Sequence, residues 1–339
     1  MKGATGFAIG CAGWLAAGFT RAALAAQPAA CPPNDALREV LPHVWVWPGE
    51  AADAHPGNQG RVSTSVVLLR PGTTPQASAP TVTVVDPGPN LKAGEALAQA
   101  IRCRWGVGVA QVINTHAHAD NVLANGALTP TGSTTPVLAT ATTAHTMAER
   151  CPDCLDSLTQ TVGADAMRGT QIVLPTATLH PGRPLPLTDR LWQVDEARHA
   201  HTRSDLLLWQ PELKLLIAGG LVYRQRLPEL AQGQLLDWVA ALERVAQWGP
   251  QHVIGTQAGG AQDIALTRHY LCDLATAVWQ AMELGLSPGE AQTIALPRYA
   301  TWAGYAQRQP FNAQRAWREL EPRWMAGEAP PCSLPHVGR

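Results

Sequence analysis

The stretch VINTHAHADN, from Val112 to Asn121, places two histidines and an aspartate at alternating positions directly after an apolar run. Side chains two residues apart project to the same side of an extended segment, so His116, His118 and Asp120 can converge on one point. Neutral imidazoles and a carboxylate are ligands that a zinc ion accepts. The spacing therefore predicts a metal site; the alternative is a polar turn whose histidines bond only to the backbone.

A third strong ligand should come from elsewhere in the chain, because zinc sites need at least three protein ligands. The segment ARHAHTRSDLLLW offers His201, directly before the start of a predicted strand. His199 lies two residues earlier and is expected on the surface or behind the ligands. A cupin site is excluded, since it needs a glutamate three or four residues beyond the second histidine, where this chain has Asn121 and Val122.

The segments around the motif predict an α/β arrangement. Alternating or β-branched runs closed by Pro and Gly predict strands at residues 43–49, 63–69 and 80–88. Ala93, Leu97, Ala100 and Ile101 recur at helical spacing, and VGVAQVINT (107–115) follows as another strand. The motif thus comes at the carboxyl end of a strand, where α/β sheets commonly bind ligands.

The second half predicts more strands and then a helical region. The strands are expected at residues 170–175, 190–197, 204–211, 214–223 and 251–260. Apolar spacing between Leu235 and Val245 predicts an amphipathic helix, and the chain from Asp263 onward is expected to be helical. The run from Ser287 to Glu290 has the form of a capping box that opens a helix.

Composition and charge narrow the functional classes. The 339 residues are 46% hydrophobic and 15% charged, which is ample for a buried core. The formal net charge is -1 and no block of like charges occurs, so nucleic acid and an anionic membrane surface are not expected partners.

The N-terminal segment predicts export. Lys2 precedes a stretch of apolar and small residues, and Ala23-Leu24-Ala25 fits a small-x-small cleavage site after residues 1–25. A retained helix is disfavoured because Arg21 and several glycines interrupt the stretch. The mature chain is therefore expected to have no membrane span and to be periplasmic or secreted.

The cysteines also suggest an oxidising compartment. Seven become six once Cys11 leaves with the signal peptide, and an even number in an exported chain predicts disulfides. Cys151 and Cys154, in the run CPDC, are predicted to form a local disulfide; metal binding or redox chemistry is the alternative. Two further bridges, with pairing left open, are expected among Cys31, Cys103, Cys272 and Cys332.

Several motifs together resemble those of the metallo-β-lactamase superfamily. They are NTHAHADN, HAHTRSD, IAGGLVY and VIGTQAGG, with Asp86 at the end of a predicted strand. The runs CPP, RCPDCL and YRQRLPELAQGQLLDW and the helical C-terminal extension are most similar to its quinoprotein-relay-system zinc metallohydrolase branch, also called SoxH-like. The similarity covers roughly residues 31–327.

The resemblance implies a fold and a division of the chain. The fold is of the α/β (α+β) class, a metallo-β-lactamase-like αββα sandwich whose two mixed sheets carry the metal site along one edge. The corresponding domain spans residues 31–262, a C-terminal helical extension spans 263–327, and a tail spans 328–339.

The resemblance also implies one complete zinc site and one degraded site. The family's first site is matched by His116, His118 and His201. Its second site uses the motif aspartate, a histidine directly after it, an aspartate in an AGD segment and often a histidine in a GHG loop; these positions read Asp120, Asn121, Gly220 and Gln257. Carboxamide oxygens are weak ligands and glycine offers no side chain, so one zinc ion is expected rather than two.

The implied activity is hydrolysis of a small-molecule substrate. A zinc ion with three histidines and an open position can activate water against an ester, lactone, thioester or amide bond. Asp120 would orient that water or accept its proton, or else have no catalytic duty. The alternative is a catalytically impaired metal-binding or accessory protein of the same fold. The branch further implies a link to periplasmic quinoprotein dehydrogenase components.

A few other polar residues are assigned structural roles. Asp86, Asp205 and His145 are expected to fix a loop or cap an element. Arg224 and Arg226 can be imagined to reach an anionic substrate group, but a salt bridge or a solvated pair is the favoured interpretation.

Overall fold

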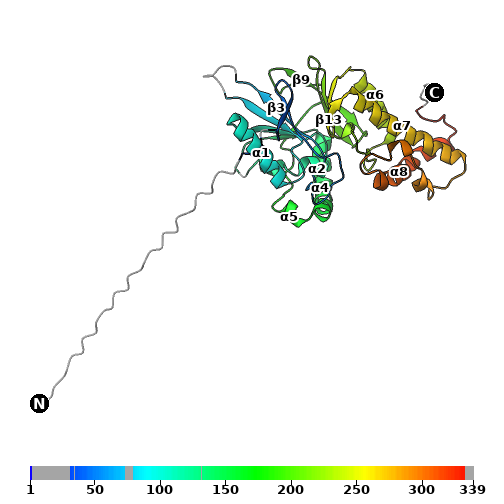
Figure 1. The fold of residues 1–339 in the computed structure, drawn as a ribbon, viewed down its shortest axis with the longest axis horizontal. Coiled ribbons are helices and arrows are strands. Elements are labelled where there is room, and N and C mark those ends of the chain that lie inside the picture. Colours follow the sequence, from blue (N-terminus) through cyan, green and yellow to red (C-terminus); the bar gives the residue numbers. More distant parts are fainter. Residues whose placement is uncertain (2–30, 34, 73–78, 131, 333–339) are drawn as a thin grey trace. The chain divides into compact units, whose positions relative to one another are not determined.

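Two mixed β-sheets packed face to face form the centre of the protein (Figure 1). The structure is a computed structural model. It describes Met1 and residues 31–33, 35–72, 79–130 and 132–332. The predicted signal peptide, apart from Met1, and the last part of the predicted tail lie outside the described residues. The described residues from Cys31 onward cluster as one compact unit.

The first sheet has seven strands in the order of the chain, antiparallel from β1 to β4 and parallel from β4 to β7. They are β1 (Arg38–Leu41), β2 (Val44–Trp47), β3 (Ser65–Arg70), β4 (Thr81–Val85), β5 (Val109–Ile113), β6 (Val137–Ala139) and β7 (Ala177–Thr178). The second sheet has six strands in the order β13-β12-β11-β10-β9-β8, with only β11 and β12 parallel. They are β8 (Leu185–Pro186), β9 (Leu191–Arg198), β10 (Ser204–Gln210), β11 (Leu215–Ile217), β12 (His252–Ile254) and β13 (Ala258–Gly260).

Helices cover the outer face of each sheet. They are α1 (Leu91–Trp105), α2 (Ala119–Val122), α3 (Asn125–Leu128), α4 (Ala141–Val162), α5 (Ala164–Met167), α6 (Leu235–Ala246), α7 (Ala261–Glu283) and α8 (Tyr305–Met325), with 3-10 turns at Gly219–Leu221, Ala291–Thr293 and Pro297–Tyr299. Helix α1 packs on the first sheet, whereas α6, α7 and α8 share one core with the second sheet. The layers are helix, sheet, sheet, helix, which confirms the predicted αββα sandwich.

Strands buried on both faces explain why this arrangement forms. In β10, Leu206 and Leu208 face the core between the sheets, while Leu207 and Trp209 face the helices. Alternate residues of a strand point to opposite faces, so an unbroken apolar run must be covered on both sides. The run SDLLLWQ therefore requires a layer of helices as well as a partner sheet.

The two sheets meet at the edge that carries the histidines. The HxHxD loop follows β5, and the loop with His201 connects β9 to β10. The backbone nitrogen of Leu206 donates to the carbonyl of Thr115 (2.8 Å), and that of Thr64 donates to the carbonyl of Thr256 (2.9 Å). These bonds bring segments that lie far apart in the sequence to one edge.

Two local predictions are wrong, and one helix was missed. Residues 170–175 form no strand, and the strand β7 lies just beyond them. The run from Ser287 to Glu290 closes on itself as predicted, with the backbone nitrogen of Ser287 donating to the Glu290 carboxylate (2.9 Å), but only a 3-10 turn follows. The 22-residue helix α4 was not predicted, because its buried side includes threonines and a cysteine, and Pro152 lies within it.

The disulfide prediction for Cys151 and Cys154 is also wrong, since both thiols are free. They lie on α4, where Cys151 packs into a small apolar cluster while Cys154 is only partly buried. Burial raises the pKa of the Cys151 thiol to about 12, which disfavours the reactive thiolate. The other four cysteines do form two bridges, with the pairings Cys31–Cys103 and Cys272–Cys332.

Replacing Cys31 and Cys103 by serine should lower the free energy of unfolding by about 2–4 kcal/mol. The bridge closes a separation of 72 residues and restricts the unfolded chain. Urea unfolding monitored by tryptophan fluorescence measures the change, and Cys154→Ser is the control because that thiol has no bridge. An unchanged midpoint in the double variant would contradict the bridge.

Candidate metal centre

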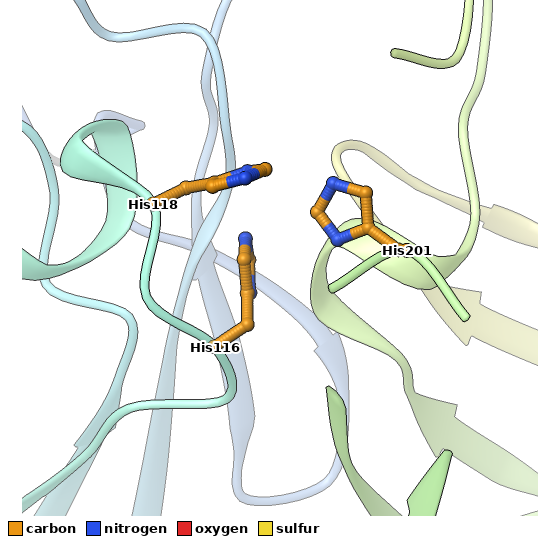
Figure 2. A group of neighbouring side chains, drawn as sticks. All are labelled: His116, His118 and His201. Carbon is orange, nitrogen blue, oxygen red and sulfur yellow. The ribbon is translucent and has the colours of Figure 1, made fainter. Parts of the chain in front are cut away.

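Three imidazoles from two distant segments face one another at the edge of the sheets. His116 and His118 come from the loop after β5, and His201 comes from the loop before β10 (Figure 2). Their rings lie with centroids 4.5–4.9 Å apart, and one ligand atom from each lies within 4.8 Å of the others. Such a set of nitrogens can hold one metal ion, zinc being the ion most often bound in this way.

His116 is oriented by a chain of hydrogen bonds from behind. The Thr115 hydroxyl donates to Asp86 Oδ2 (2.5 Å), and its oxygen lies 2.8 Å from His116 Nδ1. Because the hydroxyl proton is used by Asp86, the oxygen accepts the Nδ1 proton of His116. The lone pair of His116 is therefore on Nε2.

His201 is held in the same manner by a second carboxylate. Its Nδ1 lies 3.0 Å from Asp205 Oδ1, while the backbone nitrogen of Thr202 donates to Asp205 Oδ2 (2.7 Å). The ring also packs 5.1 Å from the ring of Trp238. His201 thus donates through Nδ1, which leaves the lone pair for metal binding on Nε2. Asp86 and Asp205 each hold a loop, as predicted.

The surroundings suit neutral histidine ligands. Burial lowers the pKa of His116 and of His201 well below the usual range, so both imidazoles are uncharged at neutral pH. The side-chain oxygen of Asn121 is buried with no hydrogen-bond partner in the described part of the chain, and it lies beside this cluster. A buried oxygen without a partner is a feature that an ion or a water satisfies. The donor set therefore fits a zinc ion.

Zinc binding should weaken little as the pH falls from 7.5 to 6. Two imidazoles of ordinary pKa, about 6.5, would together lose roughly tenfold in affinity over this window because protons compete for them. His116 and His201 have lowered pKa values, so their protonation begins only at lower pH. The zinc affinity at each pH can be measured by competition with a chelator whose own pH dependence is known. A tenfold loss by pH 6 would contradict neutral, buried ligands.

Asp120 lies in the first turn of α2, outside the group of three histidines. Its Oδ2 accepts a hydrogen bond from the Ser63 hydroxyl at 2.5 Å. Burial is the largest single influence and would raise the pKa of Asp120, but Arg226, the two neighbouring histidines and the Ser63 hydroxyl together outweigh it, so the pKa is lowered. Asp120 is therefore an ionised carboxylate beside the histidines, and its role as a ligand or base stays a prediction.

The residues at the family's second metal site have other uses here. The Asn121 amide nitrogen lies 2.9 Å from His116 Nε2. The Gln257 side chain donates to the carbonyl of Val62 (2.9 Å) and accepts from the Thr256 hydroxyl (2.8 Å).

Gly220 is constrained by the ring of His201. A Cβ atom at residue 220 would lie 2.1 Å from His201 Cε1, so the imidazole fills the space that a side chain would need. A carboxylate side chain at residue 220 would therefore require the His201 ring to move.

The comparisons with known proteins agree with this geometry. No protein-family model matches the sequence, and no curated protein matches it. Among solved structures, a metallo-β-lactamase from Pontibacter korlensis matches with a TM-score of 0.53 and 19% identity over 69% of this chain and 97% of its own. The metallo-β-lactamase FIM-1 from Pseudomonas aeruginosa in its mono-zinc form matches with a TM-score of 0.53 and 16% identity over 69% of this chain and 93% of its own. The chain has the metallo-β-lactamase fold.

A further match extends the similarity along the chain. A β-lactamase domain protein from Burkholderia ambifaria has a TM-score of 0.60 and 16% identity, covering 86% of this chain and 88% of its own. The metallo-β-lactamase fold thus accounts for most of the described residues.

Sequence reasoning missed two side chains near the three-histidine centre. Ser63 bonds Asp120, and the Tyr223 hydroxyl lies 3.3 Å from His201 Nε2. No spacing rule links them to the histidines, because they come from separate loops. The other predicted residues lie away from the ligands: His199 is exposed, and His145 pairs with Glu149 (3.2 Å) on the exposed side of α4.

Proposed function

We propose that this chain is an exported hydrolase that uses one zinc ion to cleave an ester, lactone, thioester or amide bond. The observation that carries the proposal is the set of three converging imidazoles, of which the two buried ones, His116 and His201, are oriented from behind by Asp86 through Thr115 and by Asp205. The mono-zinc form of FIM-1 indicates that the fold accommodates a single ion. A bound zinc ion supplies Lewis acidity and lowers the pKa of water.

The remaining groups have roles that follow from their charges. Asp120 is ionised and bonded to Ser63, so it can orient a water molecule or accept a proton. Burial raises the pKa of Tyr223, which keeps its hydroxyl protonated and able to donate a hydrogen bond to a developing oxyanion. The Tyr223 hydroxyl lies 3.3 Å from His201 Nε2, and the charge of Asp120 interacts with those of His118 and His116.

Export and partners are parts of the same proposal. The two disulfides are typical of proteins that fold in an oxidising compartment, which favours the periplasm or the exterior. Among the described residues no helix is long and apolar enough to cross a membrane. The assignment to the SoxH-like branch, and with it the link to periplasmic quinoprotein dehydrogenase components, rests on the sequence resemblance.

A metal-binding or accessory protein without turnover is the second candidate. The amide of Asn121 lies 2.9 Å from His116 Nε2, the nitrogen that a metal would use, and this contact favours weakened metal chemistry. The hydrolase would cleave a substrate and the accessory protein would not, so an assay of substrate hydrolysis distinguishes the two candidates.

Purified mature protein should contain about one zinc ion per chain and hydrolyse at least one member of a panel of phenyl esters, lactones and thioesters. Elemental analysis gives the stoichiometry, and hydrolysis should vanish with a chelator and return with zinc. Two zinc ions per chain would contradict the one-ion site. Bound zinc without turnover would favour the accessory role, and hydrolysis that survives the chelator would contradict zinc chemistry.

A further inference from the structure

The loop at residues 48–64 connects β2 to β3 and ends beside the three-histidine centre. The Ser63 hydroxyl, near the end of this loop, donates to Asp120 Oδ2 at 2.5 Å. The backbone nitrogen of Thr64 donates to the carbonyl of Thr256 (2.9 Å), which anchors the end of the loop to the turn between β12 and β13. The placement of Ser63 against Asp120 therefore depends on how the 48–64 loop is held.

The C-terminal helical extension contacts the same loop through an arginine. Arg308, in the first turn of α8, contacts Asp53 Oδ1 closely, and its Nε donates to Glu229 Oε2 at 3.3 Å. The Arg308 side chain is only 12% exposed, so water and salt screen this pair less than a pair on the open surface. Arg308 thus joins α8 to the middle of the 48–64 loop.

Asp53 also faces a second arginine. The Nε atom of Arg226 lies 3.5 Å from Asp53 Oδ1. Arg224 pairs separately with Asp263 at 3.2 Å, so both arginines form the salt bridges that the sequence favoured. A carboxylate that is shared by two cations belongs to a network, and networks hold their members more firmly than isolated surface pairs do.

Residue 304 leaves the room that this network needs. Gly304 is the N-cap of α8 and has a φ of 76°, a conformation that glycine adopts readily. A Cβ atom at this position would lie 2.9 Å from Asp53 Oδ2 and would also meet the Arg308 guanidinium. The missing side chain therefore allows the carboxylate of the loop to approach the start of α8.

Hydrogen bonds inside the 48–64 loop carry the position of Asp53 toward the metal centre. The Asn58 amide nitrogen donates to the carbonyl of Asp53 (2.8 Å), and its Oδ1 accepts from the backbone nitrogen of Gly60 (3.0 Å). The backbone nitrogen of Glu50 donates to the carbonyl of Arg61 (2.8 Å), which ties the two arms of the loop together. These residues form one hydrogen-bonded unit, so a restraint on Asp53 restrains the whole unit.

We propose that Arg308 is a positioning residue of the metal centre: through Asp53 it fixes the 48–64 loop, so that Ser63 holds Asp120. A fixed carboxylate loses little conformational freedom when it orients a water molecule or accepts a proton. The catalytic consequence rests on the proposed hydrolase function, whereas the tether between α8 and the loop does not. The C-terminal extension thus helps to order a centre to which it contributes none of the three histidines.

Hydrogen exchange of the purified chain, followed by mass spectrometry of its peptides, tests the tether without any turnover. Arg308→Gln should speed exchange in residues 50–63 about 10- to 100-fold, the usual size of a lost hydrogen bond to a charged group. Asp53→Ala removes the same contact from the loop side, at a side chain that is 37% exposed, and should have the same effect. Arg308→Lys should change exchange less, because it keeps the charge.

Arg323→Gln is the matched control, because Arg323 also lies on α8 but pairs with Glu328 (2.7 Å) and not with the loop. It should leave exchange in residues 50–63 unchanged. Unchanged exchange in either Arg308→Gln or Asp53→Ala would overturn the proposal. Equal acceleration by Arg323→Gln would also overturn it, since a general loosening of α8 would then explain the result. If Arg308→Gln does not fold, Asp53→Ala and Arg308→Lys still decide.

The link to Ser63 is tested on a cleaved ester at full zinc loading. Arg308→Gln should lower kcat about 10-fold in the unaltered chain but less than about 2-fold in a chain that already carries Ser63→Ala, because both side chains act on Asp120 in series. Equal falls in the two backgrounds would show independent effects and overturn the link.

The outcome is separable from that of the hydrolase proposal. If loop exchange depends on Arg308 but no ester is cleaved, the tether stands and the hydrolase function fails. If esters are cleaved with zinc but loop exchange ignores Arg308, the hydrolase function stands and the tether fails.

Discussion

Replacing Gly220 by aspartate, the residue that the family uses in its second site, should displace His201 and weaken zinc binding by more than 100-fold rather than add a second ion. The new Cβ would lie 2.1 Å from His201 Cε1 and 2.3 Å from Nδ1, and the ring is fully buried. Either the His201 imidazole moves away from Asp205, or the segment after β11 that carries residue 220 shifts. Loss of an outer-shell partner alone costs metal sites 10- to 100-fold, so displacement of the ligand itself should cost more.

The same substitution should lower stability. Overpacking of a buried site costs about 1–3 kcal/mol, and burial of an unpaired carboxylate adds to it. Gly220→Ala separates the steric effect from the charge and should weaken zinc binding as well. Gly108→Ala is the control, because a Cβ atom there meets nothing within 4 Å. If Gly220→Asp bound two zinc ions tightly, the His201 ring would be able to move aside without losing the metal. That result would contradict the prediction.

Replacing His201 by alanine should abolish tight zinc binding and any zinc-dependent hydrolysis. Of the three histidines only His116 and His118 would remain, and two imidazoles do not complete a zinc site. The variant would also leave Asp205 buried without the imidazole that it binds. Zinc content after dialysis, together with ester turnover, measures both losses.

His199→Ala is the matched control for this experiment. His199 lies two residues from His201 and is exposed, so its removal should change neither zinc content nor turnover. If His201→Ala kept one tightly bound zinc ion, the three-histidine centre would be wrong. If His199→Ala lost zinc, the third ligand would have been assigned to the wrong histidine.

Much of the centre was predictable because its signals are local. The HxHxD motif can be recognised from five residues and the strand before them. His201 was identified in the same way, because the short segment HAHTRSD also combines histidines with an aspartate before a strand. Runs such as SDLLLWQ in β10 predicted individual strands for the same reason. The αββα arrangement of those strands was implied by the family resemblance, and the structure confirms it. Asp86 and Asp205 were predicted to fix loops, but their pairing with Thr115 and His201 was not.

The errors arose where the local pattern is weak or where the pairing is distant. Helix α4 buries Thr143, Thr146 and Cys151 in positions that apolar residues usually occupy, so its amphipathic pattern is faint. Two nearby cysteines, Cys151 and Cys154, suggested a disulfide, whereas the real bridges join cysteines 72 and 60 residues apart. Sequence proximity is no guide to disulfide pairing when the fold brings distant segments together.

The sequence by itself determined the type of fold, the three histidines and the lack of ligands at Asn121, Gly220 and Gln257. These are properties of residue type and spacing, which the chain carries whatever its packing. Only the tertiary structure decided that the ring of His201 fills the space at Gly220 and that the charge of Arg226 helps to lower the pKa of Asp120. The reason is physical: burial, contact and unbalanced charge arise between segments far apart in the chain, and they exist only when the two sheets meet at one edge.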